Sequence, residues 1–163
     1  MRGIATAAAV AAAVALVTAF ASTGVAATPK KTVAFSASYS GTADVKVTDN
    51  VADISANGTG SGTLIGASKI SGVGKGDTSV QPCVPFSGPG SLVGTGTKLL
   101  FSVVSGSQGC GDEAGQVFSI AGKAKVTSAT GKLKKATGTL KLTGVYDRGQ
   151  GTFSVKLKGT LTQ

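Results

Sequence analysis

Apolar and polar residues alternate with a period of two along most of this chain, most clearly near its C-terminus. In residues 138–146 the leucines and the tyrosine occupy one parity, and Lys141 occupies the other. In residues 151–161 the apolar residues again share one parity, and two lysines take the other. A period of two is typical of strands buried on one face. We therefore predict an antiparallel hairpin that turns at Asp-Arg-Gly-Gln, residues 147–150.

The predicted hairpin has a definite register, in which Tyr146 lies opposite Gly151. The expected cross-strand pairs are then Tyr146–Gly151, Gly144–Phe153, Leu142–Val155 and Leu140–Leu157, with Lys141 near Lys156 on the other face. A shift of one residue would move the lysines into the core, so the assignment of faces is strongly specified.

The same alternation recurs upstream between clusters of glycine with threonine or serine, and no helical periodicity is present after the N-terminal segment. The predicted strands are 32–40, 43–48, 51–56, 62–72, 90–94, 97–104, 116–127, 138–146 and 151–161. Many short strands with regular turn signals favour an all-β fold. We predict a single antiparallel β-barrel of about eight strands, with a β-sandwich as the alternative. Residues 80–90 contain three of the four prolines and are expected to form an irregular loop.

The lysines of these strands are interpreted as the solvated face of the sheet. The aromatic residues mostly take the opposite parity, and Arg148 is the only arginine after residue 27. A nucleic-acid-binding face is expected to carry stacking aromatics or bidentate arginines. The pattern therefore argues against a nucleic-acid partner.

The first 27 residues have the layout of a secretory signal peptide. Arg2 precedes an apolar stretch rich in alanine and valine, which ends in small residues at Ala27. The alternative is a membrane anchor, because the apolar stretch is close to the length of a span. We predict cleavage after Ala27, a single domain over residues 28–163, no membrane span after cleavage, and a secreted, extracellular or cell-envelope location.

Both cysteines, Cys83 and Cys110, lie in the predicted domain. In an exported chain an even number of cysteines indicates a disulfide bond. We expect one intrachain Cys83–Cys110 bond, with two free thiols or an intermolecular bridge as the alternatives.

The residues suited to catalysis are few. The chain has no histidine and seven acidic residues. Of these, Asp44, Asp49 and Asp53 lie close together with Asn50 and offer oxygen ligands for calcium, but without an established loop pattern. Asp112 and Glu113 are adjacent, so on a strand they would point to opposite faces. We therefore predict no catalytic residues, no metal and no cofactor, and favour a protein that is not an enzyme. Glu113 is the acid whose burial in a cavity would change this view.

The stretch ATGKLKKATGTLKLTG, followed by a turn and GTFSVKLKGTL, resembles the closing hairpins of the allene oxide cyclase and dirigent barrel families. The matching residues are Thr130-Gly131, Leu133 and Ala136-Thr137-Gly138. The resemblance implies an eight-stranded antiparallel barrel with an apolar interior, often trimeric, which handles a small hydrophobic molecule without metal or cofactor. The polar and acidic cavity residues on which those enzymes rely have no match here.

Three hypotheses about function follow. The first is an exported barrel that binds a small apolar molecule or acts as an interaction module of the cell envelope. The second is a cofactor-free cyclase or isomerase that works through the shape of its cavity. The third is a structural protein whose basic face associates with an anionic cell-wall polymer.

Overall fold

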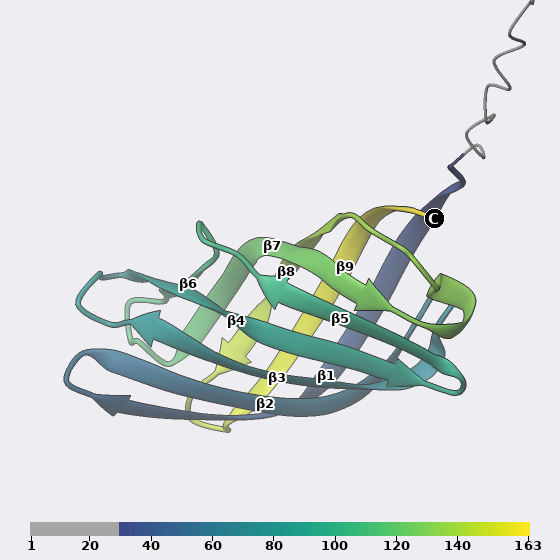
Figure 1. Ribbon diagram of the computed structural model, residues 1–163. Coiled ribbons are helices and arrows are strands. Elements are labelled where there is room, and N and C mark those ends of the chain that lie inside the picture. Colours follow the sequence, from purple (N-terminus) through teal and green to yellow (C-terminus); the bar gives the residue numbers. More distant parts are fainter. Residues whose placement is uncertain (1–29) are drawn as a thin grey trace, which may run out of the picture.

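The computed structural model describes residues 30–163, which form nine antiparallel β-strands and one short 3₁₀-helix (Figure 1). The elements are β1 (Thr32–Thr48), β2 (Val51–Gly62), β3 (Gly66–Asp77), β4 (Cys83–Gly94), β5 (Thr97–Val103), β6 (Gln108–Gly111), β7 (Val117–Ala129), η1 (Gly131–Leu133), β8 (Thr139–Asp147) and β9 (Thr152–Thr162). The predicted signal peptide lies outside the described residues.

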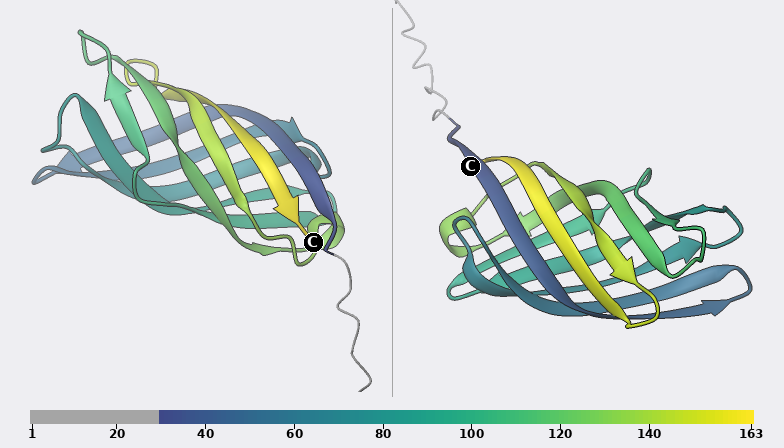
Figure 2. Two further views of the ribbon diagram at one scale, coloured as in Figure 1. Left: turned by 90° about the horizontal axis from the view of Figure 1, so that it is seen from above. Right: turned by 180° about the vertical axis from the view of Figure 1, so that it is seen from behind.

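The strands close into a single barrel (Figure 2). They follow the order β3-β2-β1-β9-β8-β7-β5-β4, and β4 pairs back with β3. The short β6 pairs with both β4 and β7, so β5 and β6 share one position between these two strands. Every strand in residues 30–163 therefore has a neighbour on each side. The predicted antiparallel barrel is confirmed, as eight positions around a closed sheet.

Ser107 lies at the break between β5 and β6 and is fully buried. Its hydroxyl donates a hydrogen bond to the Val104 carbonyl at 2.8 Å and accepts one from the Lys123 amide at 3.1 Å. The Ser107 carbonyl also accepts a bond from the Phe86 amide. These bonds satisfy backbone groups of both neighbouring strands where the ladder is interrupted.

The barrel interior is packed by large side chains that lie over glycines of neighbouring strands. Tyr39 is paired with Gly60, and Phe101 is paired with Gly90. A methyl group added at either glycine would lie within 2.7 Å of the facing ring. The interior of an eight-stranded barrel is only just wide enough for side chains, so these rings fit because glycine leaves room for them.

One end of the barrel, here called the closed end, is filled by leucines. Six of them have no measurable exposure: Leu92, Leu99, Leu133, Leu140, Leu157 and Leu161. Leu133 comes from η1, which covers this end between β7 and β8. The opposite end, here called the mouth, carries the turns at residues 49–50, 78–82, 112–116 and 148–151, toward the left of Figure 1.

The β8–β9 hairpin has the predicted faces, but its predicted register is wrong by two residues. Tyr146 pairs with Phe153 rather than with Gly151, and Lys141 pairs with Lys158 rather than with Lys156. Gly151 has a positive φ of 63° and belongs to the turn, which glycine adopts without steric cost. The Asp147 carboxylate accepts a bond from the Gln150 amide and helps to fix this longer turn. A shift of two residues preserves parity, so the buried and exposed sets are unchanged.

The predicted irregular loop at 80–90 is also wrong, because β4 begins at Cys83 and runs through this segment. Cys83 lies directly opposite Cys110 on β6, and the two form the predicted intrachain disulfide. A strand with prolines is unusual, but the pairing of β4 with β3 ends at Phe86 and is interrupted between Ser87 and Gly90, so neither Pro85 nor Pro89 has a partner on β3.

The predicted break between residues 40 and 43 is absent, since β1 is continuous over 17 residues. Gly41 marks a close approach of backbones rather than a turn. A methyl group there would lie 2.1 Å from the Asn57 carbonyl oxygen on β2. Glycine in a strand interior often marks such a close approach of another backbone.

The assignment of faces predicts different effects for two neighbouring residues of β9. Leu157→Ala should lower the free energy of unfolding by about 2–5 kcal/mol, because Leu157 is completely buried. Lys156→Ala should change it by less than about 0.5 kcal/mol, because Lys156 is exposed. Denaturant melts of both variants test this, and equal losses would contradict the assignment.

The disulfide predicts a local effect around β6. Its loop spans 27 residues, and a bond of that kind contributes about 3–4 kcal/mol by restricting the unfolded chain. Reduction should lower overall stability and should also accelerate hydrogen exchange in β6, which has only four residues. Exchange measured before and after reduction tests this, with β9 as the internal reference. Equal acceleration in β6 and β9 would show that the bond has no local role.

Candidate ligand cavity

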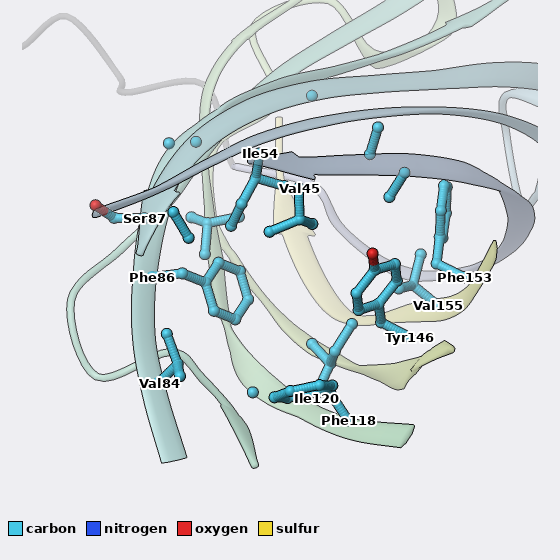
Figure 3. A pocket seen from close by; sticks show the side chains of 18 of the residues that line it. Val45, Ile54, Val84, Phe86, Ser87, Phe118, Ile120, Tyr146, Phe153 and Val155 are labelled. Atoms are coloured by element: carbon cyan, nitrogen blue, oxygen red, sulfur yellow. The ribbon is translucent and has the colours of Figure 1, made fainter. Parts of the chain in front are cut away.

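The half of the barrel next to the mouth contains a cavity of about 550 Å³. Strands from the whole circumference contribute to its wall, and Figure 3 shows their side chains converging on the space. The leucines of the closed end lie beneath it, with Leu142 and Leu157 among the lining residues. The cavity is therefore the part of the barrel interior that the chain does not fill.

The lining is almost wholly apolar. The side chains that Figure 3 labels within it include Val45, Ile54, Val84, Phe86, Phe118, Ile120, Phe153 and Val155. Within residues 30–163 no carboxylate and no lysine lines it. The polar side chains that reach it include Tyr146 in the wall and, from the turns at the mouth, Thr78, Gln81 and Arg148.

The empty volume has an identifiable cause in the glycines of β3 and β4. Gly72 faces inward, and a methyl group added there would meet only backbone atoms, the nearest at 3.5 Å. By contrast, the ring of Phe101 covers Gly90. Gly72 pairs with Gly90 across the two strands. No side chain of either strand occupies the space at Gly72, and the cavity extends to it.

The wall of the cavity has an interruption where β3 meets β4. Pairing stops after Gly72–Gly90 and resumes at Lys75–Ser87. Pro89 lies in the gap and has no N–H to donate to the ladder. Gly88 beside it has a φ of +156°. Val73 and Pro89 line the cavity at this interruption. The wall therefore lacks the regular ladder pairing between β3 and β4 at this point.

Tyr146 supplies a polar group within the cavity wall. Figure 3 shows its hydroxyl pointing into the space. Burial raises the pKa of Tyr146, the nearby Arg148 lowers it, and Asp44 and Asp147 raise it again. The phenol therefore stays protonated at neutral pH and is available as a hydrogen-bond donor to a bound molecule.

Tyr39, the other tyrosine of the barrel, has a structural role. Its hydroxyl shares a 2.8 Å hydrogen bond with the Ser68 hydroxyl, which in turn donates to the Gly66 carbonyl at 3.1 Å. Burial raises the pKa of Tyr39, and the bond to Ser68 partly offsets this. The buried hydroxyl is satisfied by this chain of bonds and is directed away from the cavity.

The acidic residues considered as calcium ligands are separated by the structure. Asp44 forms an ion pair with Lys46 at 3.5 Å, and Asp53 forms one with Lys75. Asp49 and Asn50 have positive φ values of 49° and 64° and make the tight β1–β2 turn. In residues 30–163 no three acidic, cysteine or histidine side chains come close enough to hold a metal ion.

Asp112 and Glu113 lie in the exposed turn between β6 and β7. The Asp112 carboxylate accepts a hydrogen bond from the Gln116 amide at 2.8 Å and stabilises this turn. Glu113 is exposed and does not line the cavity. Asp112 and Glu113 are therefore residues of a turn and not of the cavity.

Charge is divided between the two ends of the barrel. All seven acids lie in or near the mouth turns, together with Lys46, Lys75 and Arg148. The other twelve lysines of residues 30–163 lie on the middle and closed-end parts of the barrel or beside its terminal strands, with no acid among them. The mouth thus carries a negative balance on a molecule whose total charge is strongly positive.

Val84 and Phe86 are large apolar cavity residues that the sequence prediction missed, because their segment was assigned to a loop. A signal for them was present. Val84, Phe86, Gly88 and Gly90 continue the parity of the buried Leu92, and only the prolines between them concealed the strand.

Within residues 30–163 no helix has the length and apolar character needed to cross a membrane. Comparisons of the chain with protein-family models, with curated proteins and with solved structures found no match.

Proposed function

We propose that this protein binds one small apolar molecule in the cavity at the mouth of the barrel. The observation that carries the proposal is an apolar space of about 550 Å³ with the Tyr146 hydroxyl directed into it. Ligand sites have volumes of this order, with apolar walls and a few polar groups that orient the ligand. The disulfide and the predicted signal peptide support an exported protein that acts outside the cytoplasm or at the cell envelope.

The charges at the mouth favour an uncharged or cationic ligand. Each of the four mouth turns contains an acid or directly follows one, and Arg148 is the only base in these turns. Such a field raises the local concentration of cations and lowers that of anions. The polar end of a ligand would remain at this entrance while its apolar part occupies the cavity.

The resemblance to allene oxide cyclase and dirigent barrels supports the proposal through the fold only. The residues that carry it surround η1, where Leu133 and Ala136 are buried against the closed end. They therefore account for how the barrel is closed and lie away from the cavity. We propose that this barrel shares the architecture of those families but uses its interior differently.

Binding is favoured over catalysis because the cavity lacks a group for proton transfer. General acid–base chemistry requires a titratable group near the reacting atoms. The acids lie outside the lining, and burial raises the pKa of Tyr146 further from neutrality. A cyclase-like activity would have to depend on the shape of the cavity and on groups that stay in one protonation state near neutral pH, such as the Tyr146 hydroxyl.

The cavity can be filled without disturbing the fold, which gives a direct test. Gly72→Leu should place a side chain in the empty space, because only ordinary contacts surround this position. We expect an apolar fluorescent probe to bind the native protein and to lose about tenfold or more in affinity with this variant. Val145→Leu, on the outer face of β8, is the control and should bind normally. Equal binding by all three proteins would contradict the proposal.

The mouth charge predicts an order among three ligands with the same alkyl chain. Octylammonium should bind at least as well as octanol, and octanoate should bind more weakly than both. The difference should shrink as salt is added, because exposed charges are screened within about 10 Å at 0.1 M ionic strength. Competition against the fluorescent probe measures the order. A preference for octanoate would show that Arg148, rather than the acids, governs the entrance.

A further inference from the structure

Three lysines stand side by side on the outer face of the barrel. Lys123 on β7 pairs directly with Lys141 on β8, and Lys141 pairs directly with Lys158 on β9. All three are exposed. We call these residues the lysine row. Neighbouring strands are about 4.8 Å apart, so the row places three positive charges on adjacent strands in one line.

This arrangement is unfavourable for the folded protein by itself. Like charges directly opposite each other on a sheet are destabilising, and Lys141 has such a neighbour on both sides. An acid in the middle of the row would remove the repulsion. The acids, however, lie at the mouth, and the ion pairs of residues 30–163 are those of Lys46 and Lys75. The charge of the row is therefore left without compensation by the chain itself.

The row also lines a groove in the outer surface. The groove has a volume of about 460 Å³ and is bounded by the three lysines together with Gly106, Gln108 and Thr139. It lies beside the break between β5 and β6, where the sheet is interrupted after Val103. Ala121 and Gly122 complete the lining, so no large apolar side chain bounds the groove. Its three cations are suited to an anion rather than to an apolar molecule.

We propose that the lysine row is a binding site for a linear polymer that carries phosphate groups. Lysine is a compact point charge with three donors, which suits the oxygens of a phosphate from many directions. Three such charges in a line, within a groove, match successive phosphates of one chain. A flat membrane surface would match a convex barrel wall less well. Nucleic acid is disfavoured because all seven aromatic residues of the described part lie on inward-facing positions, where they cannot stack on bases.

The site is independent of the proposed apolar cavity, because it lies on the opposite side of the sheet. Its test uses long-chain polyphosphate as the probe, with binding measured by titration at physiological salt. Lys141→Gln should weaken binding about tenfold, as expected for one charge-assisted contact at the centre of the row. Without polymer and at low salt, the same variant should melt at a higher temperature than the native protein, because the repulsion is relieved.

Lys156→Gln is the matched control. It removes the same charge from the same outer face, but Lys156 pairs with Thr143 and Ser38 rather than with another lysine. It should weaken binding less than about threefold and should not raise the melting temperature. Equal effects of the two substitutions on affinity, or no binding of polyphosphate, would overturn the proposal.

Two further probes distinguish the source of the phosphate. Inorganic phosphate should bind far more weakly than the polymer, because it occupies one position of the row. Vesicles of equal parts phosphatidylglycerol and phosphatidylcholine should bind less well than polyphosphate at the same phosphate concentration. Stronger binding to the vesicles than to polyphosphate would indicate a membrane surface and overturn the proposal of a polymer. Equal affinity for inorganic phosphate and polyphosphate would show that the three lysines do not act together.

Discussion

The match between large side chains and the glycines that face them is the constraint on which this barrel depends. A closed sheet of eight positions leaves little room inside, and three of its largest side chains lie opposite glycines. Phe35 lies opposite Gly159, Tyr39 opposite Gly60 and Phe101 opposite Gly90. Each pair fills about the volume that two medium side chains would need. The many glycines are thus the complement of the aromatic residues, and they do not indicate disorder.

The same constraint explains why one half of the interior is filled and the other half is not. Toward the closed end the inward glycines are covered by apolar side chains, as Leu140 covers Gly159 and Ile65 covers Gly94. On β3 and β4 the inward glycines face one another at Gly72 and Gly90. One ring cannot cover both, so a space remains. The cavity is a local departure from the rule that fills the rest of the barrel.

The period of two along the chain allowed the fold class and the buried faces to be predicted, and the even number of cysteines after a signal peptide allowed the disulfide to be predicted. Parity survives errors of two residues, which is why the β8–β9 register was wrong although its faces were right. The register depends on Gly151 being part of the turn, as its positive φ shows. From the sequence alone, Gly151 could equally have been the first residue of β9. The residues Val84 and Phe86 were concealed because Pro82, Pro85 and Pro89 imitate a loop. The cavity itself could not be predicted, because it arises from which glycines face each other across strands that are distant in sequence.

The separation of acids and lysines gives the molecule a permanent electric dipole along the barrel axis. In the field of any strongly anionic surface, such a molecule is turned before contact so that its closed end leads. The mouth then faces the surrounding medium. Attachment through the lysines would therefore leave the entrance of the cavity unobstructed.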